Sequence, residues 1–200
     1  VVIASDAGAV GSNAPLSYSY DGITFTNVLT KNIVNYNGTP VILNAVYGIT
    51  YDGNMWIAIA RVSSVYSLIY SYDSICWKIL NSNVAEAGNR ISYTFDKYYI
   101  TTVFLSNAQH AISYNLKNWI RTNIYVSDVF YDGKIYLRSS STYGNLQVST
   151  ISYSYNGISW FGTNGNSLMN DCFSIASNDN IYVATGNQNN SNPNLYSIIY

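Results

Sequence analysis

The sequence predicts an all-β fold, a β-propeller made of four-stranded antiparallel blades. Three observations support this prediction: the composition, the lack of helix signals and the repetition of two short phrases. Of the 200 residues, 48% are hydrophobic, 16% are aromatic and only 10% are charged, so the chain can bury a large apolar surface. No segment keeps the i, i+3, i+4, i+7 apolar spacing of an amphipathic helix. Short strands joined by turns are therefore expected throughout.

The first phrase is an apolar strand that ends in a polar turn, and it occurs four times. The copies are LSYSYDGITF from Leu16, LIYSYDSICW from Leu68, AISYNLKNW from Ala111 and ISYSYNGISW from Ile151. Their aligned tyrosines are Tyr20, Tyr72, Tyr114 and Tyr155, which are 52, 42 and 41 residues apart. A period of about 40 to 50 residues is typical of a propeller, in which each blade completes its core against its neighbours.

The second phrase lies between copies of the first and contains a strand, a turn and another strand. It reads GITYDGNMWIAIA from Gly48, DVFYDGKIYLRSS from Asp128 and SIASNDNIYVATG from Ser174, and it is one residue shorter in SYTFDKYYITTV from Ser92. Each unit is thus strand, turn, strand, variable loop, strand, turn, strand. The best-defined unit is expected to have strands near residues 46–52, 55–61, 66–73 and 75–81.

Acidic or amide residues followed by glycine mark the turns. A two-residue type I′ turn needs positive φ at both central residues, which Gly, Asn and Asp tolerate. We therefore predict such hairpin turns, with positive φ at the glycines. The turn residues are Asp21, Gly22, Asp52, Gly53, Asp73, Asp132, Gly133, Asn156 and Gly157.

The phrases divide the chain into about 4.5 blades of a single propeller domain, residues 1–200. The division is a partial blade at 1–45, blades at 46–88, 89–125 and 126–169, and a partial blade at 170–200. Both partial blades would supply second and third strands, so they cannot combine into one regular blade. We expect the chain to belong to a larger ring of about six or seven blades, or a partner chain to cover its ends.

Two sets of residues recur once per unit. Large aromatics end the copies of the first phrase, and we expect them to pack between blades: Phe25, Trp77, Trp119 and Trp160. Alignment of the first strands places Gly48, Ser92, Asp128 and Ser174 at one level, on the face that would line the central channel. Asp128 is the carboxylate at this level and is therefore the candidate binding residue.

The Ser-x-Asp-Gly-x-x-Trp pattern of the first phrase resembles the Asp-box, or bacterial neuraminidase repeat, and the related repeats of sortilin-like and photosystem-assembly-factor-like propellers. The resemblance covers nearly the whole chain as a short repeated motif. In the standard Asp-box one residue separates Asp from Gly, whereas here they are adjacent. The resemblance implies a propeller fold. The low charge and the many Asn, Ile, Tyr and Ser residues also resemble propeller-repeat proteins of large DNA viruses and phages, which implies a virion or extracellular location.

The titratable residues give little material for catalysis. Six of the aspartates fall in predicted turns, and the remaining carboxylates are Asp6, Asp128, Asp171 and Glu86. Sialidases with Asp-boxes use an arginine cluster, but the arginines here fall at different places in the repeat: Arg61, Arg90, Arg121 and Arg138. The single histidine, His110, has no positioned nucleophile beside it and is expected on the surface. No metal-binding pattern or cofactor motif is present, so none is predicted.

Charge and hydropathy exclude further classes. A net charge of −1 does not suit a protein that binds nucleic acid through its phosphates. No apolar run reaches the roughly 18 residues that span a bilayer, so membrane insertion is not expected. The two cysteines, Cys76 and Cys172, are too far apart in sequence for a metal or disulfide framework, and we expect both thiols to be free.

The sequence therefore predicts a non-catalytic binding or scaffolding propeller that presents its loops to a protein or a glycan. By its composition it resembles a structural or a receptor-facing virion protein. Tyr, Asn, Ser and Trp supply contact area and hydrogen bonds with little charge to desolvate. The alternative is a carbohydrate-active, sialidase-like propeller enzyme whose catalytic residues lie outside this segment.

Overall fold

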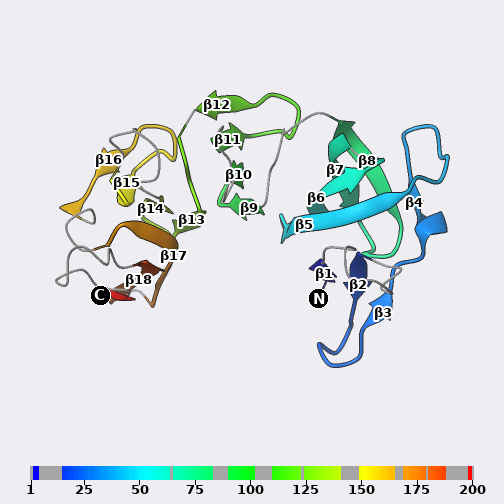
Figure 1. Cartoon of the computed structure of the whole chain (residues 1–200), viewed down its shortest axis with the longest axis horizontal. Helices are drawn as coiled ribbons and strands as arrows, with labels where there is room; N and C mark the ends of the chain where they lie inside the picture. The colour runs from blue at the N-terminus through cyan, green and yellow to red at the C-terminus, as the bar shows by residue number, and fades with distance from the viewer. Residues whose placement is uncertain are drawn as a thin grey trace. The chain divides into compact units, whose positions relative to one another are not determined.

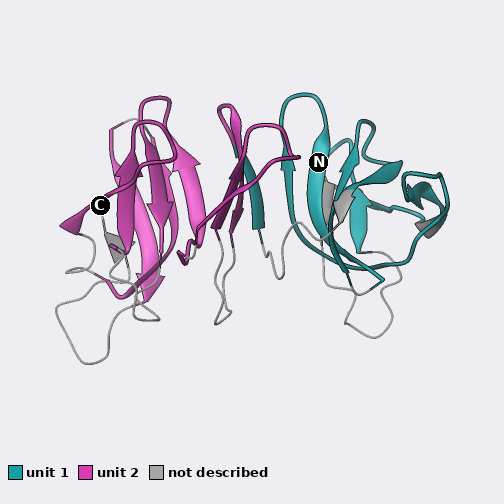
Figure 2. Cartoon of the chain, turned by 90° about the horizontal axis from the view of Figure 1, so that it is seen from above, with its two compact units in different colours: residues 1–93 teal, residues 94–200 magenta. Residues whose placement is uncertain are grey.

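A computed structural model of the chain describes residues 2–4, 15–63, 65–82, 90–101, 110–122, 124–140, 149–164, 169–178, 180–187 and 198–199. Within these residues the protein is all-β, with several small antiparallel sheets and no α-helix, as predicted. The chain forms two compact units, residues 1–93 and 94–200 (Figure 2). No closed barrel or propeller is detected among the described residues, so the ring stays a prediction.

The first unit contains two complete sheets. One has the order β1 (Val2–Ala4), β2 (Leu16–Tyr18), β3 (Thr26–Asn27). The other has the order β4 (Ile33–Val34), β8 (Trp77–Ser82), β7 (Val65–Ser71), β6 (Trp56–Val62), β5 (Leu43–Tyr51). The strands β5 to β8 pair antiparallel and lie where the two phrases predict them. The short strand β4 belongs to neither phrase and lies outside the span 46–81. It pairs parallel with β8.

Three further sheets follow the same order of strands along the chain (Figure 1). The third sheet has β9 (Arg90–Thr94), which crosses the boundary between the units, then β10 (Lys97–Thr101), β11 (His110–Ser113) and β12 (Ile120–Thr122). The fourth sheet has β13 (Asp128–Tyr131), β14 (Tyr136–Ser139), β15 (Ile151–Ser154) and β16 (Phe161–Gly162). The fifth has β17 (Asp171–Ser177), β18 (Tyr182–Asn187) and β19 (Ile198–Ile199). Alternating strands and turns in the two phrases account for these sheets.

In the second unit the fourth sheet is buried on both faces, because successive side chains of a strand point to opposite sides. Tyr136 of β14 packs in a cluster with Tyr99 and Ile112 of the third sheet. Its neighbour Leu137 packs instead with Cys172 and Ile175 of the fifth sheet. The apolar core of this unit therefore lies between sheets, on either side of β13–β16.

The turns of the second phrase differ from the predicted two-residue type I′ turn. Gly53 has φ 94° and Gly133 has φ 95°, as predicted, but neither Asp52 nor Asp132 has positive φ. The Asp52 carboxylate accepts hydrogen bonds from the amides of Asn54 and Met55, both at 2.8 Å. A side chain that caps two amides closes a longer turn, so one residue of positive φ is enough. The acid is required as an acceptor, not for its tolerance of positive φ.

The turns of the first phrase are also longer than predicted and share one hydrogen-bonding pattern. In the second copy the Asp73 carboxylate accepts hydrogen bonds from Ile75 N at 2.9 Å, Cys76 N at 2.7 Å and the Ser71 hydroxyl at 2.9 Å. Asp21, Asn115 and Asn156 do the same in the other copies. The next residue has positive φ in every copy: Gly22 (76°), Ser74 (64°), Leu116 (61°) and Gly157 (71°). The backbone geometry is retained even where glycine is not.

The aromatics predicted to pack between blades have different environments. Trp77 is fully buried in the core that also contains Leu16 of the neighbouring sheet. Trp160 is half-buried and packs against the cluster between the third and fourth sheets. Trp119 is half-buried. The prediction is wrong for Phe25, which is 40% exposed, because it precedes the short exposed strand β3.

The prediction of a surface histidine is also wrong. His110 begins β11, where it is only 1% exposed, and its ring stacks on Tyr99 at 5.8 Å between centroids. Residues two apart in a strand share a face. His110 therefore points inward with Ile112, which is buried in the core. Both cysteines are free, Cys76 exposed and Cys172 buried.

Candidate functional site

One end of the second unit gathers aromatic and charged side chains from three turns. In a strand meander, the first and third hairpin turns leave the sheet at the same end. The Phe95 turn joins β9 to β10, the Tyr114 turn follows β11, and a third turn separates Tyr131 from Tyr136. Together these residues form what we call the Lys97 cluster: Phe95, Asp96, Lys97, Tyr114, Tyr131 and Tyr136.

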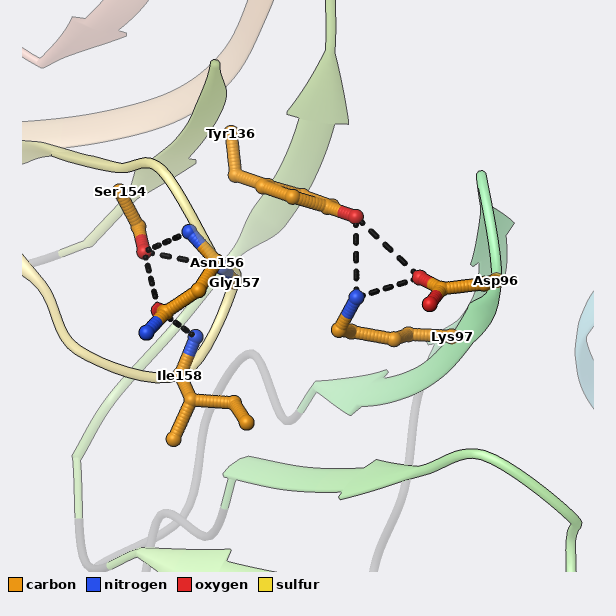
Figure 3. Close-up of polar contacts among 7 residues, drawn as sticks. All are labelled: Asp96, Lys97, Tyr136, Ser154, Asn156, Gly157 and Ile158. Carbon is orange, nitrogen blue, oxygen red and sulfur yellow. Dashed lines mark hydrogen bonds and ion pairs between the residues drawn. The ribbon is translucent and has the colours of Figure 1, made fainter. Parts of the chain in front are cut away.

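Lys97 is the centre of this cluster and is itself buried, with 5% of its surface exposed. Its Nζ pairs closely with the Asp96 carboxylate and donates a hydrogen bond to the Tyr136 hydroxyl at 3.1 Å. The same hydroxyl donates to Asp96 Oδ1 at 3.3 Å, which closes a three-membered network (Figure 3). The network joins the third sheet to the fourth and has no net charge.

Two tyrosine rings surround the ammonium group. Lys97 Nζ lies 5.1 Å from the ring centroid of Tyr114 and 5.0 Å from that of Tyr136, within the range of cation–π attraction. Burial lowers the pKa of Lys97, but the hydrogen bonds with Asp96 and Tyr136 outweigh this effect and leave the pKa above its ordinary value. Burial also raises the pKa of Tyr136. At neutral pH the lysine is therefore charged and the phenol is protonated.

Phe95 extends the cluster into solvent. It is 68% exposed, and its ring lies 5.2 Å from that of Tyr131, which lies 4.4 Å from that of Tyr136. The backbone of Phe95 has φ 64°, and the Asp96 amide donates to Thr94 O at 2.9 Å across it, which makes a γ-turn. Positive φ is costly for a bulky residue, by about 1–3 kcal/mol. The strained backbone conformation places the apolar Phe95 ring in solvent.

The cluster can bind but has little capacity for bond-breaking chemistry. Phe95 and Tyr114 are exposed, Tyr131 is half-buried, and the Asp96 carboxylate beside Phe95 is half exposed. A ligand that lies on Phe95 and Tyr131 can therefore also form hydrogen bonds at Asp96. The carboxylate is already paired with Lys97 and accepts a hydrogen bond from Tyr136, so its oxygens are engaged in the network.

Asp128, the candidate binding residue, is hydrogen-bonded within the second unit. The side chain is half-buried and accepts a hydrogen bond from Ser174 Oγ at 2.8 Å and from Val129 N at 3.0 Å. The alignment correctly placed Asp128 and Ser174 at one level, since they touch. The contact links β13 to β17 and gives the carboxylate a structural partner.

The turn carboxylates act as caps. The pKa of Asp21 is lowered by hydrogen bonds from the amides of Thr24 and Ile23. Burial raises the pKa of Asp132, but hydrogen bonds from Tyr182 and from two backbone amides outweigh it, so the pKa is lowered. Asp73 shows the same balance, with the amides of its own turn prevailing over desolvation. These carboxylates are ionised at neutral pH, because the amide and hydroxyl donors around them stabilise the charged form.

Sequence reasoning did not single out the Lys97 cluster. The available signal was the copy of the second phrase that is one residue short, SYTFDKYYITTV. The shorter connection produces the γ-turn at Phe95 and sets Asp96 beside Lys97. In the described residues, no group of three or more His, Cys, Asp or Glu is placed to hold a metal ion.

No protein-family model matches the sequence, and no curated protein matches it. No helix among the described residues is long and apolar enough to cross a membrane. Inferences about function therefore rest on the geometry of the residues.

Proposed function

We propose that the sheets are blades of a β-propeller. Support comes from contacts between first strands of successive sheets, which lie side by side around a propeller axis. In the first unit the Tyr93 amide of β9 donates to Thr50 Oγ1 of β5 at 3.0 Å. In the second unit Ser174 of β17 bonds Asp128 of β13. The capped turns of the first phrase support the resemblance to the Asp-box.

We further propose that the propeller is a non-catalytic binding domain of a virion or extracellular surface, and that the Lys97 cluster binds a glycan. The observation that carries this proposal is Phe95, an exposed ring held at φ 64° against Tyr131 and beside the Asp96, Lys97 and Tyr136 network. Strain of this kind persists where the surroundings enforce it, and it gathers at ligand-binding sites.

A glycan suits the chemistry of this surface better than a charged ligand does. The Asp96 and Lys97 charges cancel within the network, so the cluster offers no uncompensated charge to attract an ion. A sugar ring has an apolar face of C–H groups that can lie on Phe95 and Tyr131, and hydroxyls that can bond the Asp96 carboxylate at the rim. This combination of area and neutral hydrogen bonding is what the cluster provides.

The enzyme alternative has less support. Every described aspartate whose contacts are given accepts hydrogen bonds from turn amides or from partner side chains: Asp21, Asp52, Asp73, Asp96, Asp128, Asp132 and Asp171. Glycoside hydrolysis needs two carboxylates that face one bond. Turnover of a fluorogenic sialoside by this chain, abolished in Asp128→Asn, would establish the enzyme instead.

The test is a glycan array probed with the full chain, followed by calorimetric titration of the best ligand. Phe95→Ala should weaken binding by about tenfold or more, because one stacking face is lost. Tyr155→Ala is the matched control, since Tyr155 is 71% exposed but contacts Tyr153 outside the cluster. Absence of any glycan ligand, or equal losses in the two variants, would contradict the proposal, and selective binding of a protein would favour the other partner class.

A further inference from the structure

The fourth copy of the first phrase differs from the others at its tryptophan. In the second copy Trp77 Nε1 donates to Ser74 O at 3.1 Å, and in the third Trp119 Nε1 donates to Leu116 O at 3.3 Å. Each bond satisfies the carbonyl of the residue with positive φ. In the fourth copy Trp160 Nε1 is buried and has no hydrogen-bond partner in the described part of the chain. The Trp160 indole therefore lacks the hydrogen bond to the turn carbonyl that the indoles of Trp77 and Trp119 make.

Arg138 is the group beside the diverted indole. Its guanidinium carbon lies 4.7 Å from the Trp160 ring centroid, and the side chain is 5% exposed. Its Nε is buried without a hydrogen-bond partner, and no ion pair of Arg138 occurs among the described residues. Cation–π attraction offsets part of the cost of burying this charge, but a buried cation ordinarily also has an anionic partner.

His110 adds a third unpartnered group on the same side of the fourth sheet. Arg138 and Tyr136 lie two residues apart in β14 and thus share the face that packs on the third sheet. His110 projects from the third sheet, since it stacks on Tyr99 of the same cluster. Both ring nitrogens of His110 are buried without a hydrogen-bond partner among the residues that the structure describes. Buried polar atoms are rarely left unpaired, so the three residues together require an explanation.

The missing partner must be an acceptor that carries negative charge. Arginine and the indole N–H are donors only, and the neutral imidazole can turn one N–H toward the same point. Among the described residues, the carboxylates near this face are engaged elsewhere: Asp96 with Lys97, and Asp128 with Ser174 on the opposite face of β13. Water could accept these hydrogen bonds, but it would leave the guanidinium charge uncompensated.

We propose that a small inorganic anion binds between the third and fourth sheets, held by Arg138 with Trp160 and His110 as neighbouring donors. The ligand class is a compact oxyanion or halide. The proposed anion site does not use the charged groups of the Lys97 cluster, so it does not depend on the glycan proposal. Bound anion would stabilise this interface of the second unit, because it binds the folded chain and not the unfolded one.

The first experiment is thermal unfolding of the full chain during a sulfate titration. Wild type should show a saturable rise in Tm, about 5–10 °C at roughly 100 times Kd, and Arg138→Met should lack the saturable component. Arg121→Met is the matched control, because Arg121 is an exposed arginine of β12, and it should respond as wild type does. An equal response in Arg138→Met would show only general salting-out and would overturn the proposal.

The second experiment needs no variant, so it decides the matter even if Arg138→Met does not fold. Crystals of wild type grown in sodium bromide should give an anomalous peak within hydrogen-bond distance of Arg138 Nε. An ordered water at that position with no anomalous signal would overturn the proposal. So would a carboxylate of the chain seated on Arg138.

Discussion

Replacement of Gly157 by alanine tests how the third and fourth sheets approach each other. A Cβ at this position would overlap the Tyr99 hydroxyl and would lie 3.3 Å from Lys97 Cδ and 3.4 Å from Tyr136 Cε1. Gly157 also has φ 71°, which by itself costs alanine about 1–2 kcal/mol. Displacing a packed side chain costs about 1–3 kcal/mol more. Gly157→Ala should therefore destabilise the protein by roughly 2–5 kcal/mol.

The matched control is Gly133→Ala in the same sheet. Gly133 has φ 95° and no heavy atom within 4 Å of the added Cβ, so only the backbone cost applies. Because φ 95° lies further from the left-handed minimum near +57°, this control overstates the backbone cost and makes the comparison conservative. Urea denaturation should show a lower midpoint for Gly157→Ala than for Gly133→Ala at unchanged m.

A second substitution identifies the clash as the cause. The Tyr99 hydroxyl is buried and has no hydrogen-bond partner, so Tyr99→Phe alone should cost little or should stabilise. In the Tyr99→Phe background, Gly157→Ala should recover about 1–3 kcal/mol, which the double-mutant cycle measures as coupling. If Gly157→Ala costs no more than Gly133→Ala, or if the coupling is zero, the described contact between Tyr99 and this turn is wrong.

Three shorter predictions follow from other residues. Burial lowers the pKa of His110 to about 3. Below about pH 6.5 the unfolded chain therefore binds a proton at His110 that the folded chain does not. The free energy of unfolding should fall as the pH drops from 6.5 to 5, by up to about 1.4 kcal/mol per pH unit. Urea denaturation at each pH measures this, and a flat profile would place the imidazole in water. Ser74→Gly should raise the free energy of unfolding by about 0.5–1 kcal/mol, because it removes the strain of a side chain at φ 64°. The substitution keeps the backbone carbonyl to which Trp77 donates. A lower urea midpoint than that of the wild type would count against this prediction. Ellman's reagent should titrate one thiol in the folded chain, that of the exposed Cys76. Cys172 should react only after denaturation, because burial raises its pKa to about 12. Two fast-reacting thiols would show that the fifth sheet opens.

The parts of the structure that follow local rules could be predicted from the sequence. Strand positions depend on alternation within a few residues, and the predicted strands near 46–52 and 55–61 correspond to Leu43–Tyr51 and Trp56–Val62. Positive φ at Gly53 follows from the turn. The turn type did not follow, because a carboxylate that caps two amides replaces the second residue of positive φ, and the pair Asp52 and Gly53 suits both arrangements.

The shortened copy of the second phrase marks the Phe95 turn, but the rest of the Lys97 cluster could not be predicted, because it depends on contacts between sheets. Lys97 and Tyr136 are 39 residues apart in sequence, and neither belongs to a turn pattern that marks a site. His110 was predictable in principle: it precedes Ile112 by two residues, so the burial of the isoleucine already implies that the histidine points inward. The register of a residue in its strand, rather than its polarity, decides which way the side chain points.

The first phrase shows that the repeat preserves a hydrogen-bonded backbone rather than a sequence. The residue after the capping Asp or Asn differs between the four copies, yet its φ stays between 61° and 76°: Gly22, Ser74, Leu116 and Gly157. Only Gly157 has a neighbouring sheet close enough to exclude a side chain, whereas the Leu116 side chain is accommodated and buried. The strain at Ser74 and Leu116 is therefore tolerated because the Asp or Asn cap and the indole bond hold the turn. Where the indole bond is missing, at Trp160, the residue is glycine, and the tryptophan is free to lie against Arg138.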